Sequence, residues 1–100
     1  MIKHIVMWKI HDTAEGHSKA ENMAEMKEKL LALKPLIPQI KTMQVGFDFS
    51  KSPNSYDFVL IVECENKEDL AVYANHPDHV AVKGFIAKVV YSRVVADFEE

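Results

Sequence analysis

The segment LAVYANHPDHVAVKGFI, residues 70–86, holds two histidines with a proline and an aspartate between them. Pro77 has no backbone N–H, and it disfavours helical geometry at the preceding residue, His76. A helix entering this segment should therefore break near His76, and a new turn can begin with Pro77 at its first position. On an unbroken helix Tyr73 and His76 would share a face, and His79 would point about 120° away. The break can bring His79 back toward Tyr73, which predicts polar groups on one side of an apolar segment.

Composition is typical of a globular domain. The 100 residues are expected to form one domain, 1–100, since 48% are apolar and 27% charged. The net charge of −3 is mixed along the chain without a basic patch, which argues against a nucleic-acid partner. The single cysteine, Cys64, excludes a disulfide framework and indicates a reduced thiol in a cytoplasmic protein. We see no signal-peptide pattern and no apolar run near the roughly 20 residues that span a bilayer, so no membrane partner is expected.

The order of the expected elements indicates the fold class. Four segments have strand composition: 2–10, 40–47, 56–64 and 89–98. A helix is expected after the first strand and another after the third. The simplest architecture for this order is an α+β, ferredoxin-like βαββαβ fold with a four-stranded antiparallel sheet.

Sequence signals mark both helices. Ser18 followed by Glu21 fits a capping box, which places a helix start near Lys19. Apolar residues then recur at helical spacing, and two prolines end the helix: Met23, Met26, Leu30, Leu33 and Ile37, then Pro35 and Pro38. Asn66 caps the second helix, which is expected to run to His76. Polar connections are expected at 11–16 and 48–55.

Several strands are apolar on both faces. The first carries Ile2, His4, Val6, Trp8 and Ile10 on one face and Lys3, Ile5, Met7 and Lys9 on the other. In the fourth, Val89 and Val95 oppose Val90 and Val94. Two helices cover only one face of the sheet, and a bare apolar face usually marks an interface. The sequence therefore predicts a two-fold homodimer through the open sheet face.

These residues resemble the stress-responsive α/β-barrel (Dabb) family along nearly the whole chain. The resemblance rests on segments 3–9, 37–40, 45–46 and 92–98 and on the Tyr-x-x-His-Pro-x-His element at 73–79. It implies a dimeric ferredoxin-like barrel, no cofactor and a small cavity between sheet and helices in each subunit. The family includes plant olivetolic acid cyclase, which closes a linear polyketide by aldol condensation.

The resemblance also implies a site. By motif position, the histidine and tyrosine of that cyclase match His79 and Tyr73, and a first-strand histidine matches His4. The chain departs from the cyclase on the first helix, where Met26 and Leu30 replace aromatic residues. The residues expected to contact a small hydrophobic or aromatic ligand are Val6, Trp8, Met26, Leu30, His76 and Phe85.

The three polar residues suit proton-transfer chemistry. Neutral His79, with an ordinary pKa of about 6.5, suits a base that removes a proton beside a carbonyl group. The hydroxyl of Tyr73 suits a donor to the developing oxygen anion, and His4 suits a group that orients substrate. The same residues are also consistent with core packing, which is the more usual role of a buried tyrosine or of a histidine on an apolar face. The His-x-x-His spacing around a proline is not a standard zinc motif, so no metal is expected.

Three classes of function remain open from the sequence. The first is a cofactor-independent enzyme, such as a cyclase or lyase, or a cofactor-free monooxygenase acting on aromatic compounds. The second is a small-ligand binding protein, and the third a stress-responsive structural dimer. An open cavity favours the first two, whereas a cavity filled by Trp8 and Phe85 favours the third.

Overall fold

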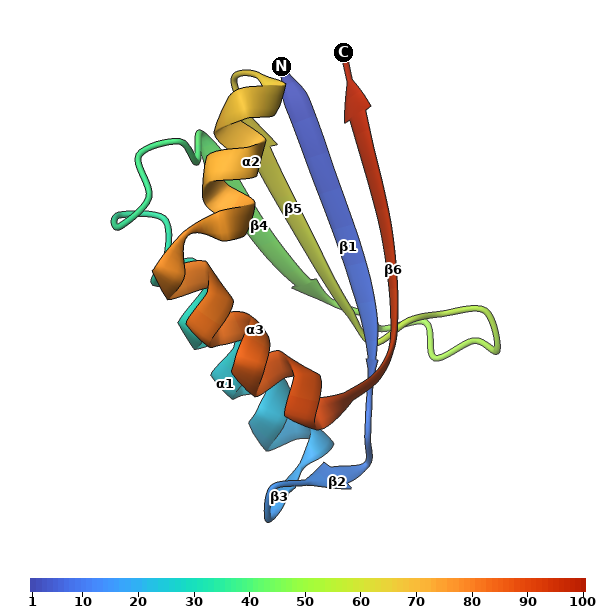
Figure 1. The fold of residues 1–100 in the computed structure, drawn as a ribbon. Coiled ribbons are helices and arrows are strands. Elements are labelled where there is room, and N and C mark those ends of the chain that lie inside the picture. The colour runs from blue at the N-terminus through green and yellow to red at the C-terminus, as the bar shows by residue number, and fades with distance from the viewer.

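A four-stranded antiparallel sheet with helices on one face makes up the computed structural model, which describes residues 1–100 (Figure 1). The elements are β1 (Ile2–Ile10), β2 (Thr13–Ala14), β3 (His17–Ser18), α1 (Lys19–Leu31), β4 (Thr42–Phe47), β5 (Phe58–Cys64), α2 (Lys67–Asn75), α3 (Pro77–Val89) and β6 (Val90–Glu99). The strand order is β4-β5-β1-β6, and every neighbouring pair is antiparallel. The predicted α+β ferredoxin-like class is confirmed.

The helical layer differs from the prediction in two ways. The break at Pro77 leads into a complete helix of 13 residues, α3, rather than a single turn. Helix α1 ends at Leu31, four residues before the first proline, although Leu33 and Ile37 still pack into the core from the turns that follow. The layer therefore contains three helices, and α3 runs beside α1 (Figure 1).

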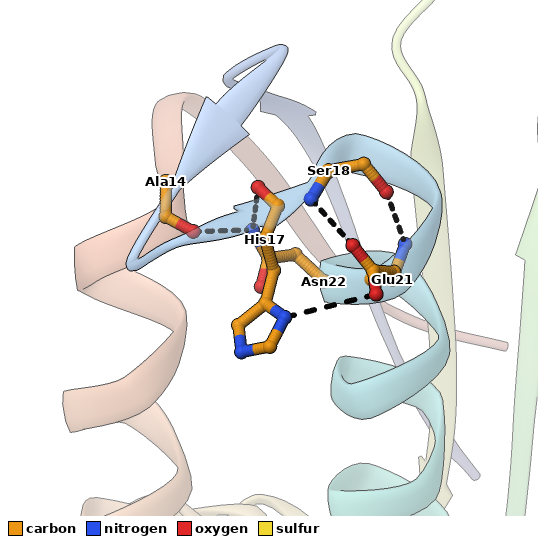
Figure 2. Close-up of polar contacts among 5 residues, drawn as sticks. All are labelled: Ala14, His17, Ser18, Glu21 and Asn22. Carbon is orange, nitrogen blue, oxygen red and sulfur yellow. Dashed lines mark hydrogen bonds and ion pairs between the residues drawn. The ribbon is translucent and has the colours of Figure 1, made fainter.

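The N-terminus of α1 is fixed by the predicted capping box (Figure 2). The Glu21 backbone N–H donates to Ser18 Oγ, and the Ser18 N–H donates to Glu21 Oε1. The preceding connection is a small β2–β3 hairpin, which the sequence analysis described only as polar. Buried Asn22 holds this hairpin by donating to the Ala14 carbonyl at 3.0 Å. Its turn residues, Glu15 and Gly16, both have positive φ, as a tight hairpin turn requires.

The alternation along β1 places its two faces as predicted. Val6, Trp8 and Ile10 are at most 5% exposed beneath the helices. A β-bulge changes the alternation of β6 where this strand pairs with the C-terminal end of β1. Lys9 pairs with Ser92 but Ile10 pairs with Val90, so β6 carries one extra residue there. Val90 therefore lies on the helix-covered side and not on the face of Val94, and the predicted grouping of these valines is wrong.

The sheet face opposite the helices is apolar. Its cross-strand neighbours Ile5, Met7, Val59, Ile61 and Val94 form what we call the open face. Met7 is 37% exposed and Val94 is 38% exposed. The β4–β5 loop projects away from the helices (Figure 1), and its Phe49 is 92% exposed. None of the three helices has the length and apolar character needed to cross a membrane.

Candidate functional site

A cavity of about 220 Å³ lies between the helix-covered face of the sheet and the helices. Its lining is mostly apolar, as is usual for small-molecule sites. The lining residues are His4, Val6, Trp8, Leu30, Leu60, Tyr73, Ala74, His79, Lys83, Ile86, Ala87, Val90 and Arg93. The three residues predicted for catalysis, His4, Tyr73 and His79, therefore meet at one cavity. Three of the six residues predicted to contact a ligand also line it: Val6, Trp8 and Leu30.

The chain break at Pro77 brings Tyr73 and His79 together. Helix α2 ends at Asn75, and His76 takes an extended conformation with φ −63° and ψ 134°. Pro77 then occupies the first turn of α3, where its missing N–H costs nothing. As a result the His79 ring stacks on the Tyr73 ring, with centroids 4.2 Å apart and planes inclined by 29°. The predicted effect of the break on these two side chains is confirmed.

The protonation of His79 is set by its surroundings. Its Nδ1 lies 3.1 Å from the Ala74 carbonyl oxygen, which can only accept, so Nδ1 carries the hydrogen. The lone pair of the neutral ring is then on Nε2. Burial lowers the pKa of His79, and the charges of Lys83, His4 and Arg93 lower it further, against the opposing effect of the Ala74 hydrogen bond. At neutral pH the ring is therefore a neutral base.

The hydroxyl of Tyr73 is buried and has no hydrogen-bond partner. Buried polar atoms nearly always have one, and an unpaired hydroxyl costs about 1–3 kcal/mol. Burial also raises the pKa of Tyr73, so the group stays protonated and retains a hydrogen to donate. Tyr73 is also one of the residues that line the cavity.

His4 joins the pair from β1. Its ring lies edge-on to Tyr73, with centroids 6.1 Å apart. Its Nδ1 bonds to the Asp97 carboxylate from the directly opposite position on β6. A carboxylate only accepts, so Nδ1 donates, and the other ring nitrogen is not engaged by this bond. Asp97 was not predictable as a partner of His4 from the sequence, because this contact depends on the β1–β6 register.

Seven residues of the cavity wall were not predicted from the sequence, and two of them are charged, Lys83 and Arg93. Lys83 lies four residues after His79 in α3, and residues at this spacing share a helix face. That spacing was a usable signal. Arg93 lies opposite Trp8 in the β1–β6 pairing, so it could be found only with the register.

The other three predicted contact residues do not line the cavity. Met26 is fully buried in the core. His76 is the N-cap of α3, where its Nδ1 accepts from the Asp78 N–H at 3.2 Å. Phe85 lies under Lys29, whose Nζ is 5.3 Å from the ring centroid, so it packs between α1 and α3. Trp8 forms part of the wall, and the cavity is not filled by Trp8 and Phe85.

The lowered pKa of His79 predicts a pH dependence of stability. The imidazole of His79 binds a proton more readily in the unfolded chain than in the folded protein. The contribution of neutral His79 to the free energy of unfolding is therefore complete above the ordinary pKa of 6.5, and it is lost as the pH falls through the lower pKa of the folded state. Between about pH 7.5 and about pH 5, the urea midpoint of His79→Gln should fall less than that of the native protein. The exposed His11→Gln control should follow the native protein. Equal falls for native protein and His79→Gln would contradict the assignment.

The fold and cavity define a class of protein, the ferredoxin-like α+β domains with an apolar cavity between sheet and helices. No group of three or more His, Cys, Asp or Glu side chains is arranged to hold a metal ion. The chain belongs to the stress responsive A/B barrel domain (Dabb) family, whose model matches residues 2–100. This confirms the resemblance seen in the sequence.

Three relatives illustrate the similarity. A stress-response A/B barrel domain-containing protein of Arabidopsis thaliana is 35% identical over 82 residues, which cover 82% of this chain and 30% of that protein. A dimeric protein of unknown function from Bacteroides fragilis is 33% identical, with a TM-score of 0.85 over 99% of this chain and 95% of that one. Hydroxynitrile lyase from Passiflora edulis has a TM-score of 0.82 over 97% of this chain and 90% of its own, but at 13% identity this likeness shows the fold alone.

Proposed function

We propose that this chain forms a homodimer whose cavities bind a small hydrophobic or aromatic carbonyl compound and catalyse proton transfer on it without a cofactor, as a lyase or cyclase does. The observation that supports this most is the stacked Tyr73–His79 pair on the cavity wall. One member of the pair is a neutral base and the other a buried, unpartnered donor. Core packing alone gives no reason to leave the Tyr73 hydroxyl without a partner.

The proposed step moves one proton and one electron pair. His79 Nε2 takes a hydrogen from the carbon beside the ligand's carbonyl group, and the electrons of that C–H bond shift onto the carbonyl oxygen. Tyr73 donates a hydrogen bond to this oxygen, which stabilises the developing charge. The enolate carbon then attacks a second carbonyl carbon in the same molecule. The protonated His79 returns its proton to the new alkoxide, so the ring ends neutral.

The surroundings of His79 support a base that gains a proton reversibly. Its Nδ1–H remains bonded to the Ala74 carbonyl, which stabilises the positive ring that forms during the step. The His4–Asp97 pair supports a positioning role for His4, because the carboxylate fixes the imidazole beside Tyr73. The lyase among the structural relatives has this same fold, so the fold is compatible with lyase chemistry.

The direct test is hydrogen exchange on a simple ketone. Proton NMR in D₂O would follow loss of the signals beside the carbonyl group of 1-phenylpropan-2-one. We expect exchange faster than that caused by an equal concentration of free imidazole, together with saturable shifts of the His79 and His4 ring signals. Exchange no faster than with imidazole, with saturable shifts, would indicate a binding protein instead of an enzyme.

The open face supports the homodimer. Its five apolar residues make a continuous surface on β1, β5 and β6, and contiguous exposed apolar surface usually marks an interface. The projecting loop with exposed Phe49 adds apolar area beside it. The Bacteroides fragilis relative, 33% identical, is described as dimeric. A two-fold axis through the open face would bring two such sheets together.

Met7→Lys is expected to convert the protein to a monomer at micromolar concentration. Met7 lies on the open face between Val59 and Val94, so the dimer would bury an unpaired charge. Sedimentation equilibrium should show dimerisation weakened by about 100-fold or more. Leu36→Lys is the matched control, because Leu36 is 55% exposed in the turns after α1. A dimeric Met7→Lys protein, or a monomeric native protein, would contradict the proposed interface.

A further inference from the structure

Two positively charged side chains line a cavity that is otherwise mostly apolar. Lys83 comes from α3 and Arg93, the chain's single arginine, from β6. Both are exposed residues, and neither lies within ion-pair distance of a carboxylate, which is also true of six of the other ten lysines. What distinguishes Lys83 and Arg93 is that they line the same cavity.

The rest of the wall does not compensate these charges. No aspartate or glutamate is among the lining residues. The nearby carboxylate of Asp97 is bonded to His4. The charges of Lys83 and Arg93 both lower the pKa of His79, and that of Arg93 opposes the upward shift of the pKa of Tyr73. The positive potential therefore reaches the two residues of the proposed reaction.

We propose that the ligand of this cavity is a small carboxylic acid, with its apolar body in the cavity, a carbonyl oxygen at Tyr73 and its carboxylate held by Lys83 and Arg93. This inference rests on the proposed function and specifies its substrate class. The guanidinium of Arg93 suits the two oxygens of a carboxylate, and Lys83 adds a point charge. A cavity of about 150 Å³ binds benzene, so one of about 220 Å³ suits a benzene-sized ring with a short side chain.

Three ligands of similar size that differ in charge and head group test this inference. Binding of 3-phenylpropanoate, 3-phenylpropanamide and benzyl phosphate would be measured by NMR titration of the intact protein, with the His4 and His79 ring signals as the readout. We expect the acid to bind at least about tenfold more tightly than the amide. Tighter binding of the phosphate ester than of the acid would overturn the carboxylate assignment in favour of a phosphorylated ligand.

Variants that each remove one positive charge test whether Lys83 and Arg93 cause the preference for the acid over the amide. Lys83→Met and Arg93→Met keep much of each apolar stem, and each should weaken acid binding by about threefold or more without changing amide binding. In the double variant the acid and amide should bind alike. Lys88→Met is the matched control, because Lys88 is, like Lys83, an exposed lysine of α3 but does not line the cavity. A loss in Lys88→Met as large as in Lys83→Met would overturn the inference, since only the overall charge would then matter.

The outcomes separate this inference from the proposed function. Equal binding of acid and amide, with saturable shifts at His4 and His79, would overturn the carboxylate assignment and leave the proton-transfer proposal standing. Absence of binding by the acid, the amide and the neutral ketone would contradict both. Preference for the acid without any hydrogen exchange on the ketone would support the ligand class and contradict catalysis.

Discussion

His79→Ala is expected to lower the rate of ketone hydrogen exchange by about 100-fold or more, the usual contribution of a positioned base. The reason is that Nε2 of His79 carries the available lone pair, because Nδ1–H is bonded to the Ala74 carbonyl. Ligand binding should persist, since the apolar wall is unchanged. The ratio of exchange rates, measured by proton NMR at equal ligand saturation, gives the effect directly.

Two further variants distinguish loss of the base from loss of folding. His79→Gln keeps a polar side chain in place and removes the base, so it should lose exchange as His79→Ala does. His11→Ala removes a histidine that lies outside the cavity and should retain the native rate. Exchange within about threefold of the native rate in both His79 variants would exclude this residue as the base.

Tyr73→Phe should separate stability from activity. The lost hydroxyl is buried and unpartnered, so its removal should leave the free energy of unfolding unchanged or raise it by about 1–2 kcal/mol. The exchange rate should nevertheless fall by about tenfold or more, because the enolate oxygen loses its donor. Urea unfolding and the NMR exchange assay measure the two effects on the same sample.

Tyr91→Phe is the matched control for this change. Tyr91 is 58% exposed, so water satisfies its hydroxyl, and neither stability nor exchange should change. Destabilisation of Tyr73→Phe by more than about 1 kcal/mol would mean that the hydroxyl has a partner in the native protein. An unchanged exchange rate would remove Tyr73 from the proposed step.

Local chemistry made much of the fold predictable. The capping box at Ser18, the cap at Asn66 and the alternation along β1 each depend on residues close in sequence, and the structure has all three. The break at Pro77 was predictable for the same reason. The full length of α3 was not, because its apolar pattern does not distinguish a buried helix from a strand over a short run.

The candidate site was predictable only where one segment or one alternation supplies the residue. Tyr73 and His79 share a motif, and His4 follows the alternation of β1. Arg93 and Asp97 reach the cavity region through the pairing of β6 with β1, and that register includes a bulge that no local signal marks. Phe85 was misplaced because the rotation of α3 about its own axis depends on how the helix packs after the break.

The junction between α2 and α3 sets up a competition for a single acceptor. In a continuous helix the Asp78 amide would donate to the Ala74 carbonyl four residues earlier. Here that amide donates to His76 Nδ1, and the imidazole of His79 donates to the Ala74 carbonyl in its place. Straightening the helix would therefore remove the anchor that selects one imidazole tautomer. The kink thus determines which ring nitrogen carries a proton as well as where the ring lies.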